Sequence, residues 1–153
     1  MSNLIKTPVG ILEIKTSDEF ITGLNFSESK DLLIAEDTEN YLIRETKNQL
    51  AAYFEGKLRN FDLPISLKGT PFREKTWNAL IKIPYGEVIS YKELALSIEN
   101  PKAVRAVGGA NNKNPIVIIV PCHRVIGADG KLVGYGGGLS KKKFLLNLEG
   151  NKI

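Results

Sequence analysis

The sequence is poor in residues that cross-link a fold or hold a metal ion. Its 153 residues include a single cysteine, Cys122, and a single histidine, His123. One cysteine cannot close an internal disulfide, and structural zinc sites draw several ligands from these two residue types. We therefore expect a fold with no disulfide, no bound metal and no cofactor.

Long hydrophobic runs are also missing. No apolar run approaches the roughly 20 residues that a membrane-spanning helix needs, and residues 1–10 lack the hydrophobic stretch of a signal peptide. We expect a cytoplasmic protein without a membrane partner, in which Cys122 stays reduced. With 42% hydrophobic and 25% charged residues, the composition is typical of a globular protein that buries a core.

Charge is spread unevenly along the chain. Residues 1–69 carry 8 basic and 11 acidic side chains, whereas residues 70–153 carry 13 basic and 6 acidic ones. The basic C-terminal half favours a polyanionic partner, most simply nucleic acid. The alternative is a solvated basic surface that has no specific partner.

Residues 1–68 have the patterns of a small scaffold domain of mixed α and β structure. The segments 9–14 and 21–26 are short, rich in β-branched residues and separated by a polar turn, which predicts a hairpin. Apolar residues on one helical face predict a helix over about 37–55. The alternating segment 61–65 contains a proline and is therefore typical of an edge strand.

Residues 69–153 predict a mainly helical domain. Thr70 followed by proline is the N-cap of a first helix, and the capping box Ser90–Glu93 opens a second helix over about 91–98. Asn100 and Pro101 are expected to cap a third helix that ends near residue 112. The short connection between the second and third helices is typical of a helix-turn-helix, although many helical hairpins share it.

The third predicted helix is rich in small residues and carries basic ones. Val104 and Val107 are expected to face the core, and Arg105 lies on the opposite face. Such a surface suits close approach to the minor groove of double-stranded DNA, or tight packing on a neighbouring helix. The residues that we predict to contact DNA are Lys102, Ala103, Arg105, Ala106, Gly108 and, beyond this helix, Arg124.

The only cysteine and the only histidine follow a run of five apolar residues, 116–120. This run predicts a buried strand that stops at Pro121, so that Cys122 and His123 lie in a turn. A free cysteine is often an inert core residue. Beside a histidine that a carboxylate orients, its thiolate becomes available as a nucleophile. Glu149 is the candidate for that carboxylate.

The end of the chain predicts a loop and a final helix. Residues 134–138 form a glycine-rich loop with one aromatic residue, which matches no phosphate-binding fingerprint and is expected to line a pocket. The final helix, over about 140–148, is expected to pack through Phe144, Leu145 and Leu148. Its first residues, 141–143, are three lysines that oppose the helix dipole and are therefore available to phosphates or to solvent.

Taken together, these motifs closely resemble the O6-alkylguanine-DNA alkyltransferases. The resemblance covers about residues 70–150 and rests on several motifs: Arg105-Ala-Val-Gly-Gly-Ala110, Asn114-Pro115, Pro121-Cys-His-Arg124, Gly137-Gly-Leu139 and Leu148-Glu-Gly150. It implies an α+β fold with an RNase H-like N-terminal lobe and a winged-helix-like C-terminal domain. It also implies a monomeric protein that repairs duplex DNA containing O6-alkylguanine, and O4-alkylthymine as well.

The family's mechanism implies a role for each matching residue. The lesion is flipped out of the duplex and its alkyl group passes irreversibly to Cys122, with His123 as the water-mediated base. The resemblance implies the following further roles: Glu149 orients His123, Asn114 ties the helix-turn-helix to the active site, Tyr91 contacts the base, Arg105 replaces the extruded nucleotide, and Val133, Gly134, Tyr135 and Gly136 line the base pocket.

The sequence departs from some relatives at Gly136, where they have a serine that contacts the lesion. Three other interpretations remain at this point: a non-catalytic protein that flags alkylated DNA, a Cys-His hydrolase, and a helix-turn-helix regulator with an inert cysteine. The first class lacks the cysteine that this chain has. The second gives no reason for the basic helix rich in small residues.

Overall fold

The computed structural model describes residues 2–27, 40–135 and 137–151. The chain forms two compact units, residues 1–66 and 67–153, each of which is described by itself. Both helices and strands are present, so the mixed α and β class predicted from the sequence is confirmed. None of the helices in the described part of the chain has the length and hydrophobicity of a membrane span.

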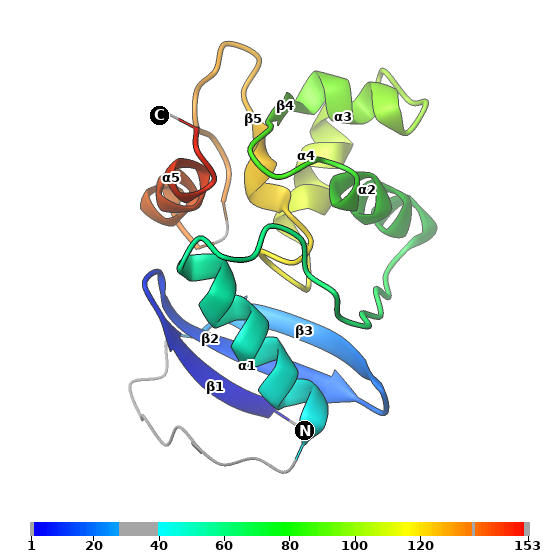
Figure 1. Cartoon of the computed structure of the whole chain (residues 1–153). Coiled ribbons are helices and arrows are strands. Elements are labelled where there is room, and N and C mark those ends of the chain that lie inside the picture. The colour runs from blue at the N-terminus through cyan, green and yellow to red at the C-terminus, as the bar shows by residue number, and fades with distance from the viewer. Residues whose placement is uncertain (1, 28–39, 136, 152–153) are drawn as a thin grey trace. The chain divides into compact units, whose positions relative to one another are not determined.

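The first unit is a three-stranded antiparallel sheet with one helix against it (Figure 1). Strand β2 (Gly10–Ser17) lies between β1 (Ser2–Thr7) and β3 (Phe20–Phe26), with a bulge at Lys15/Thr16. The hairpin predicted from residues 9–14 and 21–26 is therefore confirmed. Strand β1 was not predicted, because it reaches β2 through a Pro-Val turn that lacks an Asn-Gly signal.

Helix α1 (Tyr41–Phe54) contributes one apolar face to the core of this unit. Its N-cap is Asn40, whose side chain accepts a hydrogen bond from the amide of Ile43 at 3.0 Å. Ile43, Leu50 and Tyr53 are fully buried, as their helical spacing requires. Residues 37–39 of the predicted helix lie outside the described residues. The segment 61–65 forms a single bridge to β3 rather than a strand.

The second unit is mainly helical. Helix α2 (Pro71–Ile81) begins at the Thr70 cap, and α3 (Tyr91–Ser97) begins at the predicted capping box. Helix α4 (Val104–Asn112) packs against both α2 and α3. The remaining elements are the short parallel strands β4 (Ile89–Ser90) and β5 (Val125–Ile126), the 3-10 helix η1 (Cys122–Arg124), and α5 (Leu139–Leu148).

Helix α4 differs from its prediction in two respects. It starts at Val104 without a side-chain cap, because residues 101–103 form a turn in which the Ala103 amide bonds to the Asn100 carbonyl at 3.0 Å. Val104, predicted to be core, is 37% exposed, whereas Val107 is buried. The buried face of α4 is completed by Ala110 and Asn111 instead.

The apolar run 116–120 is not a strand. Ile118 has a φ of +72° and the run folds into a tight turn, in which the Val120 amide bonds to the Ile116 carbonyl at 3.0 Å. Asn114 closes the turn: its amide donates to the Val120 carbonyl at 2.7 Å, and its oxygen accepts from the Ile116 amide at 3.0 Å. These bonds satisfy buried backbone groups that a strand would pair with a neighbour. The run is buried as predicted, but in another conformation.

Candidate active site

The backbone bends at Cys122 and His123, as predicted. Pro121 precedes η1, a single turn that holds Cys122, His123 and Arg124, all of them buried. The Asn111 side chain of α4 donates to the Cys122 carbonyl at 3.3 Å. The turn that carries the thiol is therefore bonded directly to the second helix of the helix-turn-helix.

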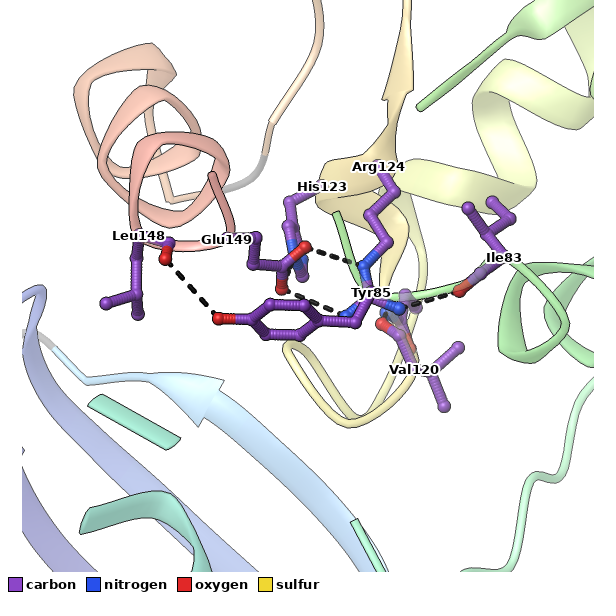
Figure 2. A network of polar contacts seen from close by, with 8 residues as sticks. Ile83, Tyr85, Val120, His123, Arg124, Leu148 and Glu149 are labelled. Atoms are coloured by element: carbon purple, nitrogen blue, oxygen red, sulfur yellow. Dashed lines mark hydrogen bonds and ion pairs between the residues drawn. The ribbon is translucent and has the colours of Figure 1, made fainter. Parts of the chain in front are cut away.

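A buried network surrounds the carboxylate of Glu149, which follows the end of α5 (Figure 2). His123 Nε2 lies 2.8 Å from Glu149 Oε2. Arg124 donates to the same carboxylate from Nε at 2.8 Å and from Nη2 at 3.0 Å. The third guanidinium nitrogen, Nη1, donates to the Ile83 carbonyl at 2.7 Å. The charge of the carboxylate is therefore balanced inside the protein by a bidentate contact with the arginine.

This network determines which nitrogen of His123 carries the proton. A carboxylate paired with an arginine is an acceptor only, so the nitrogen that faces it, Nε2, must be the protonated one. Burial lowers the pKa of His123, and the hydrogen bond that His123 donates to Glu149 opposes that shift only in part. The ring is consequently neutral, and its second nitrogen, Nδ1, is buried without a hydrogen-bond partner among the described residues. Nδ1 is therefore the atom able to take up a proton.

The thiol of Cys122 is poorly ionised in the resting protein. Only 4% of the residue is exposed, and burial raises the pKa of the thiol to about 11, against smaller lowering effects of Asn114 and Lys142. Thiolate is the reactive form of cysteine. A reaction at this sulfur at neutral pH therefore requires that the proton leave as the reaction proceeds, and the adjacent His123 is a neutral base.

Family models match both units of the chain. Residues 1–67 match the ribonuclease-like domain of 6-O-methylguanine DNA methyltransferase, and residues 71–151 match its DNA-binding domain. The chain belongs to the 6-O-methylguanine DNA methyltransferase family. The resemblance seen over about residues 70–150 is thereby confirmed, and the match of residues 1–67 extends it to the N-terminal unit, which the sequence motifs did not identify.

Individual members of this family are similar over nearly the whole chain. A methylated-DNA--protein-cysteine methyltransferase of Methanosarcina barkeri is 49% identical and covers 99% of this chain and 98% of its own. The constitutive enzyme of Bacillus subtilis is 46% identical, covering 94% and 92%. The crystal structure of Mycobacterium tuberculosis OGT in complex with DNA is 44% identical, covers 97% of this chain and 91% of its own, and superimposes with a TM-score of 0.86.

The residues predicted to line the base pocket lie on the segment between β5 and α5. Tyr91 donates its hydroxyl to the Val133 carbonyl at 3.1 Å, which places α3 against this segment. Burial, together with Cys122, raises the pKa values of both Tyr91 and Tyr135, so both phenols stay protonated. Gly134 is exposed. Gly136 lies outside the described residues.

The residues predicted to contact DNA divide into two groups. Lys102, Arg105 and Ala106 are exposed around the start of α4, and Ala103 and Gly108 are partly exposed there. Arg124 is different, because only 7% of it is exposed and its guanidinium is bonded to Glu149 and to the Ile83 carbonyl. A direct contact of Arg124 with DNA does not agree with this burial, and we assign it to the support of Glu149 instead.

Sequence reasoning missed Lys142. The three lysines 141–143 were expected to face phosphates or solvent, yet Lys142 is fully buried, whereas Phe144, expected in the core, is 41% exposed. The signal was available: Lys142, Leu145 and Leu146 follow the spacing of one helical face, and all three are buried. Among the described residues, no group of three or more His, Cys, Asp or Glu side chains could hold a metal ion.

Proposed function

We propose that this family member repairs alkylated guanine in duplex DNA by moving the alkyl group from guanine O6 to Sγ of Cys122. The chain is a DNA-repair methyltransferase whose acceptor is a cysteine, as its family and relatives indicate. The observation that carries the assignment to particular atoms is the bond between Glu149 and His123 Nε2, because it leaves Nδ1 of the residue next to Cys122 as the nitrogen able to accept a proton.

The reaction balances without a cofactor. The thiol proton passes to His123 Nδ1 through a bridging water, and the sulfur attacks the alkyl carbon. A carbon–sulfur bond forms as the carbon–oxygen bond breaks, and its electron pair stays on the purine. Uptake of a proton then gives normal guanine. A thioether is a stable product, so we expect each molecule to act once. The same chemistry applies to O4-alkylthymine, which also carries an alkoxy group on its ring.

The small-residue face of α4 supports DNA binding through the minor groove. At Gly109 an added Cβ would meet no atom within 4 Å, and at Gly108 only Tyr91 ring carbons, the nearest at 3.8 Å. Packing within this unit therefore does not explain why two glycines, each costing about 1 kcal/mol relative to alanine, stand in a helix. Close approach of a second molecule does explain them, and the neighbouring Lys102 and Arg105 are suited to DNA.

Flipping makes the lesion accessible to a buried thiol. Cys122 is too deeply buried to meet a base that stays stacked in a duplex. We infer that Arg105 occupies the space of the extruded nucleotide and that Tyr91 contacts the base and crowds its phosphate. We propose that Val133, Gly134 and Tyr135 provide the pocket wall, and the sequence resemblance adds Gly136 to it. Asn114 holds the turn before Cys122. We also propose that a single monomer is sufficient to repair each lesion.

The decisive experiment follows the alkyl group itself. The protein is incubated with a duplex that contains one O6-methylguanine, and both products are analysed by mass spectrometry. We expect one methyl group on the Cys122 peptide, normal guanine in the DNA, and no more than one transfer per chain. The Cys122→Ser variant should bind the same duplex but leave the lesion in place.

The outcome also separates the competing functions. Binding of the alkylated duplex without any gain of mass would show a protein that flags damage. Equal binding of alkylated and unmodified duplex without transfer would indicate a regulator, and hydrolysis of a small ester or amide without transfer would indicate a hydrolase. Each of these three results would overturn the proposal.

A further inference from the structure

Lys142 is a buried charged residue to which the repair reaction gives no part. Its Nζ atom donates hydrogen bonds to three backbone carbonyls, those of Val125 at 2.5 Å, Val133 at 2.8 Å and Gly134 at 3.4 Å. An ammonium group has three N–H donors, so the number of donors matches the number of carbonyls. The side chain thus joins α5 to β5 and to the segment that carries the predicted base pocket.

The same segment is held from a second side. Tyr91 of α3 donates to the Val133 carbonyl, which therefore receives hydrogen bonds from two side chains of two different helices. Next to it, Gly134 has a φ of +63°, and a Cβ there would lie 3.2 Å from the Tyr91 hydroxyl. The backbone at 133–134 is consequently fixed in a conformation that glycine tolerates and that leaves little room for a side chain.

We propose that Lys142 is a positioning residue for the lesion: its ammonium group holds residues 133–134 against β5 and Tyr91, so that the pocket is already formed when the base arrives. This proposal rests on the proposed function and deepens it. A buried cation is costly, and burial lowers the pKa of Lys142 from 10.5 to about 8. A lysine kept at such a cost, where an apolar residue would fill the space, is consistent with a role in activity rather than in stability.

Within the described ranges, few charged or titratable groups lie around the ammonium. The Tyr91 ring lies 5.9 Å from Nζ. Cys122 and His123 interact with it electrostatically, since Lys142 lowers the pKa of both. Loss of the Lys142 proton leaves an amine with two N–H donors for three carbonyls. We call the three hydrogen bonds from Lys142 Nζ the clamp. Both the clamp and the positive charge of Lys142 near Cys122 therefore weaken as the pH rises through about 8.

The test compares Lys142→Met with Lys143→Met. Methionine keeps the length and volume of the buried side chain but has no donor, and the neighbouring Lys143 is exposed on the same helix. With duplex containing O6-methylguanine, we expect Lys142→Met to lower the single-turnover rate at saturating protein by about tenfold or more, because a misplaced substrate reacts slowly. Affinity for undamaged duplex should stay within about twofold of wild type, and Lys143→Met should show no loss in rate.

The pH profile distinguishes positioning by an ammonium group from simple packing. His123 and Cys122 titrate in both proteins, so their effects largely cancel in the ratio of the wild-type rate to the Lys142→Met rate. That ratio should fall as the pH rises through about 8. A ratio that is constant between pH 7 and 9.5 would overturn the proposal, and so would transfer by Lys142→Met at the wild-type rate.

A measurement on the wild-type protein keeps the proposal testable if Lys142→Met does not fold. In NMR titrations, the amide signals of residues 131–135 should shift with the same midpoint as the Lys142 side chain, near pH 8. Signals that do not follow that titration would refute the clamp. This readout needs no substrate, so it separates failure of the clamp from failure of the proposed repair reaction, which is judged by methyl transfer to Cys122 alone.

Discussion

His123 and Glu149 are held together inside the protein, with Nε2 and Oε2 2.8 Å apart and both side chains fully inaccessible. They come from the turn at η1 and from the residue after α5, which are 26 positions apart in the sequence. The pair fixes the imidazole as a neutral ring whose free lone pair is on Nδ1. In the proposed reaction it also stabilises the imidazolium that forms when the thiol proton arrives.

Glu149→Gln tests this pair. The amide keeps the shape of the side chain but removes the charge that balances Arg124 and stabilises a protonated His123. We expect methyl transfer to slow by at least about a hundredfold, since general-base assistance is typically worth that much. Single-turnover kinetics with a methylated duplex measures the effect.

The same change should lower stability. Removing one partner of a buried ion pair leaves the other uncompensated, and we expect the free energy of unfolding to fall by about 3 kcal/mol. Glu87→Gln, at an exposed position in the same unit, is the matched control for urea denaturation. Wild-type rates in Glu149→Gln would remove Glu149 from the mechanism.

Arg124→Met tests whether this arginine acts inside the protein or on DNA. Its guanidinium makes its hydrogen bonds to Glu149 and the Ile83 carbonyl. We therefore expect a loss of about 3 kcal/mol in unfolding free energy and slower transfer, because Glu149 loses the partner that holds it. Affinity for undamaged duplex, measured by fluorescence anisotropy, should be unchanged. A clear drop in that affinity would show that Arg124 contacts DNA.

Arg124 and Lys142 show where a sequence is informative and where it is not. Local signals identified the capping box at Ser90 and the bend at Cys122, because both depend on residues within a few positions. The partners of Arg124 are Ile83 and Glu149, which are 41 and 25 positions away. Nothing in the motif around Arg124 indicates that its charge is turned inward.

The prediction of a strand over residues 116–120 was wrong for a related reason. Five apolar residues predict burial, and burial was found, but hydrophobicity does not indicate which groups satisfy the backbone. In the structure the side chain of Asn114 does so, from just outside the segment. The contact between His123 and Glu149 could be predicted because the need of each residue for a partner is visible in the sequence, whereas the support provided by Asn111 and Lys142 depends on tertiary contacts.

The raised pKa of Cys122 predicts a pH dependence of stability. The folded protein holds the thiol proton up to about pH 11, whereas the unfolded chain releases it near 9. Between these values the unfolded state binds fewer protons, so the contribution of the thiol to stability is complete below about pH 9 and declines as the pH rises towards 11. Urea denaturation should show the difference between wild type and Cys122→Ser shrinking over this range. A difference that grows instead would contradict a buried, protonated thiol.

Arg105→Ala tests the flipping role of α4. Arg105 is exposed, whereas the guanidinium of Arg124 is bonded to Glu149 inside the protein. We expect transfer from duplex DNA to slow by about tenfold or more, because the extruded nucleotide has no replacement in the stack, while transfer from the free base O6-methylguanine stays within about twofold. Equal losses with both substrates would place Arg105 at the reaction centre rather than in the stack.

Gly109→Ala separates stability from DNA binding on the same helix. Gly109 has nothing within 4 Å of an added Cβ and has no positive φ, so alanine fits the free protein without strain. Its higher helix propensity should raise the unfolding free energy by up to about 1 kcal/mol. If α4 enters the minor groove, the added methyl group obstructs close approach, and affinity for duplex should fall although the protein is more stable. A variant that is stabilised and binds duplex as tightly as wild type would show that this face of α4 does not approach DNA closely.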